Sequence, residues 1–172
     1  MDFDWLKTRL ANASDVETTL VDSSAEICEA FLADRLTIYR AVDDGASLMA
    51  VVQMGLDGFG RVKVRIDSNR SVAGYVGATR QLVNIRNAYD DEELAPLQMQ
   101  HKMLRVIDER TGYRTTQILA APIVADGKLL GVIELLNRKD ERRFPKACEK
   151  DAAALCEVLA QAFARTRSTA LS

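Results

Sequence analysis

A single carboxylate interrupts an apolar run near the end of the chain. Glu134 is flanked by Val132, Ile133, Leu135 and Leu136, inside a segment that the pattern predicts to be a β-strand. Burial of an ionised carboxylate without a hydrogen-bonding partner costs a large free energy. Two interpretations remain open: Glu134 points to the solvated face of a sheet, or it belongs to a polar site inside the fold.

A second candidate site lies at the start of residues 71–80, which read SVAGYVGATR. Ser71 is a good N-cap for a short helix with an apolar face. The first turn of a helix carries free N–H groups and the positive end of the helix dipole. Such a helix start is suited to a phosphate. The alternative is a connecting helix whose N-terminus contacts water.

Residue types for covalent or metal chemistry are scarce. His101 is the sole histidine and has no neighbour at metal-ligand spacing, so we expect it to be exposed. Cys28, Cys148 and Cys156 fit neither a disulfide framework nor a zinc site, and they suit a reducing compartment. The sequence has no phosphate-binding loop, dinucleotide fingerprint or kinase signature. We therefore expect no catalytic residue, no metal and no cofactor.

The composition is typical of a globular protein. The 172 residues are 48% hydrophobic and 28% charged, which is enough for one domain with a full core. A net charge of −2 and a pI near 5.5 argue against a nucleic-acid partner. No apolar run is long enough to span a membrane, and the N-terminus lacks a signal-peptide core. We expect a cytoplasmic protein.

The chain ends are predicted to be helical. Residues 1–33 carry two apolar stripes at helical spacing, and Ser14 or Asp15 could cap the second helix. Residues 146–172 predict a third helix with a wide apolar band. The band consists of Ala152, Leu155, Cys156, Val158, Leu159, Ala162 and Phe163. It is wider than one contact with a sheet needs, so we expect part of it to face another subunit.

The central residues 34–145 are predicted to form the sheet. Strands are expected at residues 36–42, 48–54, 62–66, 82–85, 118–125 and 129–136. Asp126-Gly127 is the signal of a two-residue hairpin between the last two. The chain is thus predicted to be a single domain, residues 1–172, of the α/β (α+β) class. Its sheet would be mixed and largely antiparallel, with about six strands. Terminal helices would cover one face and ligand-binding elements the other.

Three short motifs follow one another in the second half of the chain: TGYRT, ILAAPI and GVIELLNR. Together with residues 65–89 they resemble the core of a GAF domain. The likeness is greatest to the cyclic-nucleotide-binding GAF domains of phosphodiesterases and adenylyl cyclases. It extends from Asp34 to the C-terminal helix, and it implies a GAF-like fold with a small-molecule pocket.

The resemblance implies ligand contacts at matching positions. The backbone amides of Val72 and Ala73 would contact the cyclic phosphate. The side chains that it places in the pocket are Thr37, Thr111, Thr115 and Glu134. A hydroxyl can both donate and accept, so it can serve a phosphate oxygen or a purine edge.

Residues 90–109 are predicted to form one long polar helix. The resemblance implies that this segment folds over the nucleotide as a lid, with Met103 and Leu104 against the purine. Methionine adapts well to irregular surfaces. Ordinary core packing of the same apolar residues is the alternative.

Two departures from the family pattern bear on ligand binding. The Phe-Asp pair that reads the base in cGMP binders aligns with Gln53-Met54, which favours adenine over guanine. The N-K-F-D-E signature is present at four positions, namely Asn137, Arg138, Phe144 and Glu149. Cys148 replaces the signature Asp, and Asp151 is a candidate substitute for it.

The resulting hypothesis is a regulatory domain that binds a cyclic nucleotide, cAMP before cGMP, and signals to an attached or partner output domain. The alternative is a GAF-type dimerisation module with no nucleotide ligand or with another small molecule. In either case we expect a homodimer through the terminal helices. GAF-related methionine sulfoxide reductases and bilin-binding GAF domains need a pocket cysteine. All three cysteines here lie on predicted terminal helices, so neither role is expected.

Overall fold

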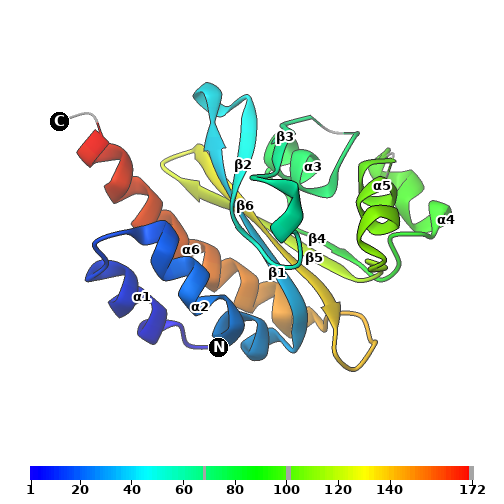
Figure 1. Ribbon diagram of the computed structural model, residues 1–172, viewed down its shortest axis with the longest axis horizontal. Coiled ribbons are helices and arrows are strands. Elements are labelled where there is room, and N and C mark those ends of the chain that lie inside the picture. The colour runs from blue at the N-terminus through cyan, green and yellow to red at the C-terminus, as the bar shows by residue number, and fades with distance from the viewer. Residues whose placement is uncertain (68, 100–101, 171–172) are drawn as a thin grey trace.

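The computed structural model describes residues 1–67, 69–99 and 102–170, and His101 lies outside them. The strands are β1 (Ala33–Val42), β2 (Ser47–Gln53), β3 (Lys63–Arg65), β4 (Val83–Ile85), β5 (Ile118–Ala125) and β6 (Lys128–Arg138). They form one sheet in the order β3-β2-β1-β6-β5-β4 (Figure 1). The predicted six-stranded, largely antiparallel sheet is confirmed, and each strand pair in the described residues is antiparallel.

The hairpin between β5 and β6 has the predicted two-residue turn. Asp126 and Gly127 both have positive φ angles, 50° and 73°. Two consecutive positive φ angles match the right-handed twist of the strands that the turn joins. β6 also pairs with β1, so the apolar second half of the hairpin lies at the centre of the sheet.

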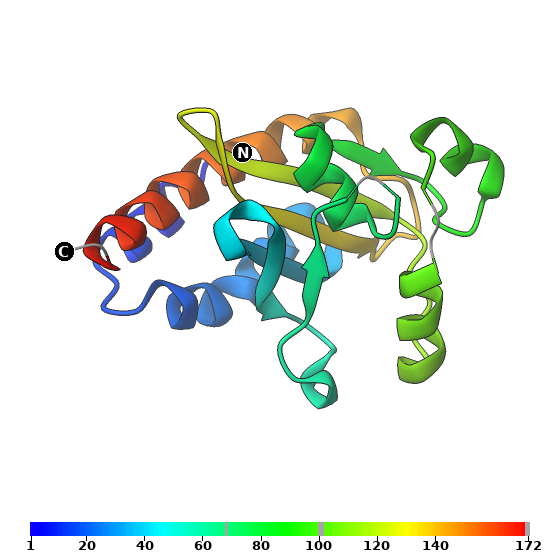
Figure 2. The same ribbon diagram turned by 90° about the horizontal axis from the view of Figure 1, so that it is seen from above.

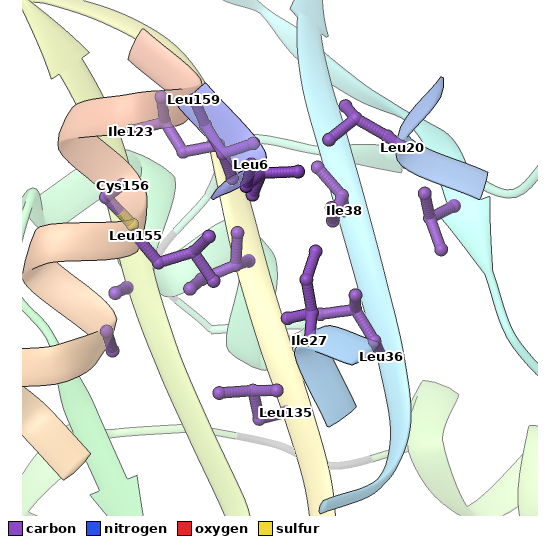
Figure 3. Packing of buried hydrophobic residues seen from close by; sticks show 14 of the residues in the cluster. Leu6, Leu20, Ile27, Leu36, Ile38, Ile123, Leu135, Leu155, Cys156 and Leu159 are labelled. Carbon is purple, nitrogen blue, oxygen red and sulfur yellow. The ribbon is translucent and has the colours of Figure 1, made fainter. Parts of the chain in front are cut away.

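Three helices cover one face of the sheet: α1 (Asp4–Ala11), α2 (Val16–Phe31) and α6 (Lys146–Ala170) (Figure 1). Asp15, and not Ser14, caps α2, because its carboxylate accepts the N–H groups of Glu17 and Thr18. Side chains from these helices meet alternate residues of the central strands in one core (Figure 3). Burial of each large aliphatic side chain contributes roughly 1.5–3 kcal/mol. The sheet is therefore fixed from this side.

The apolar band of α6 is used largely within the chain. Leu155, Leu159 and Phe163 are fully buried, at 0% exposure, and Val158 is half-buried against the same core. α1 accounts for the extra width of the band, because it packs beside α6 as well as beside α2. No helix in the described part of the chain is both long and apolar enough to cross a membrane.

The other face of the sheet carries α3 (Val72–Thr79) and a second apolar cluster. The prediction of one helix over residues 90–109 is wrong. The structure has α4 (Asp91–Leu94), the 3-10 turn η3 (Ala95–Leu97) and α5 (Lys102–Thr111). Pro96 lacks a backbone N–H for a continuous helix, and Gln98 ends η3 at a left-handed φ of 52°. α4 and α5 lie at the end of the molecule away from the C-terminus (Figures 1 and 2).

The described residues also form two further 3-10 turns, η1 (Asp43–Gly45) between β1 and β2 and η2 (Asp57–Phe59) before β3. Alternation along β1 separates its side chains cleanly. Leu36 and Ile38 enter the core beneath the terminal helices, whereas Thr37 and Tyr39 point to the other face. That second face is where the polar residues collect.

Candidate functional site

A cavity lies between the second face of the sheet, the start of α3 and helix α5. Its volume is about 70 Å³, and its walls combine apolar side chains with a few polar ones. Of the residues that the sequence assigns to ligand contacts, the following line it: Thr37, Met54, Val72, Ala73, Met103, Leu104, Thr111, Thr115 and Glu134. Gln53 is not among the lining residues. The structure therefore gathers most of the predicted site around one space.

Gln53 uses its side chain to close a loop. Its amide nitrogen donates to the carbonyl oxygens of Leu56, at 3.1 Å, and Gly60, at 2.6 Å. Its amide oxygen accepts the backbone N–H of Val62 at 2.9 Å. Met54, the next residue, does line the cavity. The pair aligned with the base-reading Phe-Asp thus presents one apolar side chain to the cavity.

Glu134 points into the cavity, which answers the question that the sequence left open. It lies directly across from Thr37 in the β1–β6 register, and both line the cavity. Its carboxyl accepts hydrogen bonds from the backbone N–H of Ala73 and from the Tyr39 hydroxyl. Burial raises the pKa of Glu134 to about 7, and the two hydrogen bonds limit that rise. The group is thus poised to change its charge near neutral pH.

The start of α3 is capped as predicted. The Ser71 hydroxyl accepts the Gly74 N–H at 3.0 Å, and α3 runs from Val72. Ala73 is buried, and its N–H is directed at Glu134. The backbone amide that the resemblance assigns to a phosphate therefore already faces a carboxylate in this structure. An incoming anion has to replace that carboxylate or share the amide with it.

Asp108 is a site residue that the sequence analysis missed. It is buried and lines the cavity from α5. Its carboxylate accepts the backbone N–H of Thr115 at 2.9 Å, the Thr115 hydroxyl at 3.0 Å and the Tyr89 hydroxyl at 2.5 Å. Burial and the neighbouring carboxylate raise the pKa of Tyr89 to about 12. An acid in a polar helical segment looks exposed in the sequence, so the pattern held no signal for it.

The two threonines of the TGYRT motif, Thr111 and Thr115, both use their hydroxyl hydrogens inside the protein. Thr115 donates to Asp108, and Thr111 donates to the carbonyl oxygen of Ile107 at 2.9 Å. Each can still accept a hydrogen bond from a ligand through a lone pair. The Thr111 bond stays within α5, whereas the Thr115 bond ties α5 to the segment that leads into β5. α5 therefore covers the cavity from a defined position.

Arg35 is the second residue that the sequence analysis missed. It lies two residues before Thr37 on β1 and lines the cavity on the same face. Its guanidinium carbon is 3.5 Å from the centroid of the Tyr113 ring. The Tyr113 hydroxyl in turn donates to Asp34 at 2.7 Å. Strand alternation from Thr37 was the signal that could have found Arg35.

The signature residues form a structural joint beside the cavity. The Asn137 amide oxygen accepts the N–H groups of Thr116, at 2.8 Å, and Gln117, at 3.0 Å. Its amide nitrogen donates to the Tyr113 hydroxyl and to the Arg114 carbonyl oxygen. Asn137 thereby ties the end of β6 to the segment that links α5 with β5.

The remaining signature residues differ in part from expectation. Arg138 makes a two-bond ion pair with Asp140, at 2.8 and 2.9 Å, and also lies against the Cys148 thiol. Asp151 instead binds the N-terminal ammonium group at 2.6 Å. Asp140, and not Asp151, is thus the acid that pairs with Arg138 in this structure. Phe144 is buried in the core, and Glu149 accepts the Asn84 amide N–H at 2.9 Å.

None of the three cysteines is among the residues that line the cavity, although the Cys28 sulfur lies 3.6 Å from that of Met54. Cys28 is on α2, and Cys148 and Cys156 are on α6; all three are free and buried. Burial raises the pKa of the Cys28 thiol to about 11 and also raises that of Cys156. Such thiols are not thiolates near neutral pH. Within the described ranges, no cluster of three or more His, Cys, Asp or Glu residues could hold a metal ion.

Known proteins resemble this chain at two levels. An 81-residue stretch is 36% identical to a probable 3',5'-cyclic phosphodiesterase of Caenorhabditis elegans, and another match of 81 residues is 33% identical to a cGMP-specific 3',5'-cyclic phosphodiesterase of Drosophila erecta. These stretches cover 47% and 46% of this chain but only 10% and 6% of the phosphodiesterases. This chain therefore compares with a small part of each enzyme.

The fold has close counterparts among solved structures. The GAF domain of a phosphoenolpyruvate-protein phosphotransferase from Coxiella burnetii matches with a TM-score of 0.76 at 20% identity, over 98% of this chain and 94% of that one. At this identity the likeness concerns the fold alone. The family model of the GAF domain matches residues 15–166. That range includes every strand of the sheet and every wall of the cavity, so the chain belongs to the GAF domain family.

Proposed function

We propose that this domain is a regulatory sensor that binds a 3',5'-cyclic nucleotide in the cavity under α5 and signals to an attached or partner output domain. The observation that carries the proposal is the arrangement of that cavity. A capped helix start, a titratable carboxyl and a methionine-bearing helical cover surround one space. The likeness to phosphodiesterases adds support, because cyclic nucleotides are the substrates that the names of those relatives state.

In this proposal the cyclic phosphate contacts the backbone amides of Val72 and Ala73. The dipole of α3 and its free N–H groups favour an anion there. Glu134 then gives up the Ala73 N–H, either by rotating away or by taking up a proton. Thr37, Thr111 and Thr115 offer hydroxyl oxygens along the rest of the wall.

The cover over the cavity has to move for a nucleotide to enter. A cavity of about 70 Å³ is well below the ~300 Å³ at which small-molecule sites usually begin. α5 contributes Met103, Leu104 and Ile107 to the wall, and its Asp108 is hydrogen-bonded to Thr115, in the segment that leads into β5. We infer that displacement of α5 is the signal. A ligand shifts such an equilibrium only by its difference in affinity between the two positions.

At the finer level we propose cAMP before cGMP. Met54 is an apolar wall residue, and the Gln53 amide is engaged in its own loop, so this pair offers no donor-acceptor edge to a guanine. The name of the Drosophila relative states cGMP for that enzyme as a whole. Both nucleotides therefore belong in the first experiment.

No enzymatic role is proposed. Asp108 and Glu134 are the acids of the cavity wall, and both are engaged as hydrogen-bond acceptors for neighbouring protein groups. A cytoplasmic location is part of the proposal. The three free cysteines support it, because unpaired thiols suit a reducing compartment.

Homodimerisation through the terminal helices is also part of the proposal. Val21 on α2 supports it, because this apolar side chain is 51% exposed on the layer of terminal helices. Leu159 and Phe163 cannot form the interface without unfolding, since both are fully buried. Should no nucleotide bind, the alternative is a dimerisation module that has no nucleotide ligand or that binds another small molecule.

Isothermal titration of the purified chain with cAMP and with cGMP tests the proposal. Binding of either nucleotide, with a higher melting temperature in its presence, is the expected result. AMP serves as a control, since it has the same base without the cyclic phosphate. Absence of binding to both cyclic nucleotides at millimolar concentration would eliminate the nucleotide proposal.

A further inference from the structure

Arg35 is a cation of the cavity wall with no hydrogen-bond or ion-pair partner among the residues that the structure describes. The side chain is half-buried, so water solvates it only in part. The other arginine of the wall, Arg70, is exposed and lies 3.7 Å from Asp67. A guanidinium carries five N–H donors and no acceptor. Donors that are partly withdrawn from water and left without protein partners suggest that a ligand supplies the acceptors.

The guanidinium is held in a fixed orientation. The Tyr113 ring stacks on it, with the ring centroid 3.5 Å from the guanidinium carbon. Gly55 lies against it as well, because a Cβ atom at Gly55 would overlap Cζ, Nη1 and Nε of Arg35 together. Contact with all three atoms at once means that Gly55 covers a face of the plane and not its edge. The ring and the glycine cannot share one face, so they cover opposite faces.

This arrangement leaves only the edge of the guanidinium for recognition. With both faces covered, a further aromatic ring cannot stack on it. The N–H groups at the edge lie in one plane and are spaced to match two acceptors side by side. We propose that Arg35 is a ligand-binding residue that donates paired, in-plane hydrogen bonds to the bound nucleotide. This inference rests on the proposed function of the cavity.

Two parts of a cyclic nucleotide offer such a pair of acceptors. One is the phosphate, through two oxygens. The other is the guanine edge, through O6 and N7, which adenine lacks because its N6 is a donor. Arg35 touches Gly55, next to Met54, whereas the α3 amides lie beside Glu134. The phosphate and the guanine edge offer the same pair of acceptors, but only the phosphate is common to cAMP and cGMP.

The test compares cAMP and cGMP affinities of the intact chain with those of Arg35→Gln and Arg35→Lys, by isothermal titration. Arg35→Gln is expected to weaken binding about 10- to 100-fold, the loss typical of charge-assisted hydrogen bonds. Arg35→Lys keeps the charge and the aliphatic stem but lacks the planar fork, so it is expected to restore less than half of the loss on a logarithmic scale. Arg65→Gln is the matched control, because Arg65 is exposed on β3 and is not part of the cavity wall.

Each outcome has one meaning. An equal loss for both nucleotides assigns Arg35 to the phosphate, and a loss for cGMP alone assigns it to the guanine edge. Full affinity of Arg35→Gln, or full rescue by Arg35→Lys, overturns the proposal. If the unaltered chain binds neither nucleotide, the proposed function fails separately. GMP carries both acceptor pairs and then tests the role of Arg35. We expect GMP to raise the melting temperature of the unaltered chain and not that of Arg35→Gln. Any other result overturns the inference.

Discussion

The Asp108 carboxylate accepts two hydrogen bonds from Thr115, one from the Thr115 backbone N–H at 2.9 Å and one from the Thr115 hydroxyl at 3.0 Å. Both residues are buried, at 7% and 2% exposure. The pair joins α5 to the segment that enters β5. A threonine that the family resemblance assigns to the ligand thus also anchors the cover of the cavity.

Thr115→Val is expected to lower the free energy of unfolding by about 1–3 kcal/mol, because it removes one donor to a buried carboxylate. Urea denaturation at pH 7 measures the change. Thr8→Val is the control, since Thr8 is exposed on α1 and its substitution should change stability by less than ~0.5 kcal/mol. Equal effects of the two substitutions would show that the Asp108 contact contributes nothing.

Glu134 is expected to make stability depend on pH. Its pKa is about 7 in the folded chain and near 4.5 when unfolded, so the folded state binds more protons in between. The contribution is fully present below pH 4.5 and is lost as pH rises through 7. Unfolding of Glu134→Gln at pH 5 and pH 8 should reveal this. From pH 5 to pH 8, the free energy of unfolding of the variant should rise by up to about 3 kcal/mol relative to that of the unaltered chain. If the variant and the unaltered chain differed in free energy of unfolding by the same amount at both pH values, the raised pKa would be contradicted.

Anion binding is expected to follow the same protonation. At pH 8 an ionised Glu134 competes for the Ala73 N–H and repels a phosphate, whereas at pH 6 most of the carboxyl is neutral. Among the described residues, the other charged groups of the wall are Arg35, Arg70 and Asp108. Neither arginine changes charge in this range. Affinity for cAMP should therefore be up to about tenfold higher at pH 6 than at pH 8. In Glu134→Gln the affinity for cAMP should be the same at pH 6 and pH 8. If the difference persisted, another titrating group would be its cause.

Asn137→Ala is expected to destabilise the chain by about 2–4 kcal/mol. The substitution removes an acceptor for the Thr116 and Gln117 N–H groups and a donor to Tyr113 and Arg114. Thermal unfolding measures the loss. Asn12→Ala is a control with one exposed side-chain hydrogen bond, to the Thr8 carbonyl oxygen. If Asn137→Ala and Asn12→Ala lowered the melting temperature equally, the hydrogen bonds of Asn137 would contribute no more to stability than the single bond of Asn12.

Light scattering is expected to show a dimer for the unaltered chain and a monomer for Val21→Glu. The reason is that a charge in the centre of an apolar interface opposes association. Circular dichroism should be the same for both, because Val21 is exposed in the single chain. A monomeric unaltered chain would refute dimerisation, and a dimeric variant would place the interface away from Val21.

The sequence by itself determined the type and order of most elements. Two apolar runs and the Asp126-Gly127 signal located the central hairpin, and helical spacing located α2 and α6. These features depend on local backbone geometry, which neighbouring residues control. The N-cap at Ser71 belongs to the same class, since capping needs only residues three positions apart. The break at Pro96 was equally local and was missed because the apolar spacing of residues 90–109 outweighed it.

Only the tertiary structure decided what the polar side chains contact. Asp108 and Arg35 look like ordinary charged residues, yet the packing of α5 and the loop after β2 brings both to the cavity. The acid that pairs with Arg138 proved to be Asp140, because Asp151 faces the N-terminus. Glu134 reaches the Ala73 amide only because α3 packs on the face of the sheet to which Glu134 points, although the two residues are far apart in sequence. Such contacts depend on distances across the fold, and side-chain spacing along the chain does not encode them.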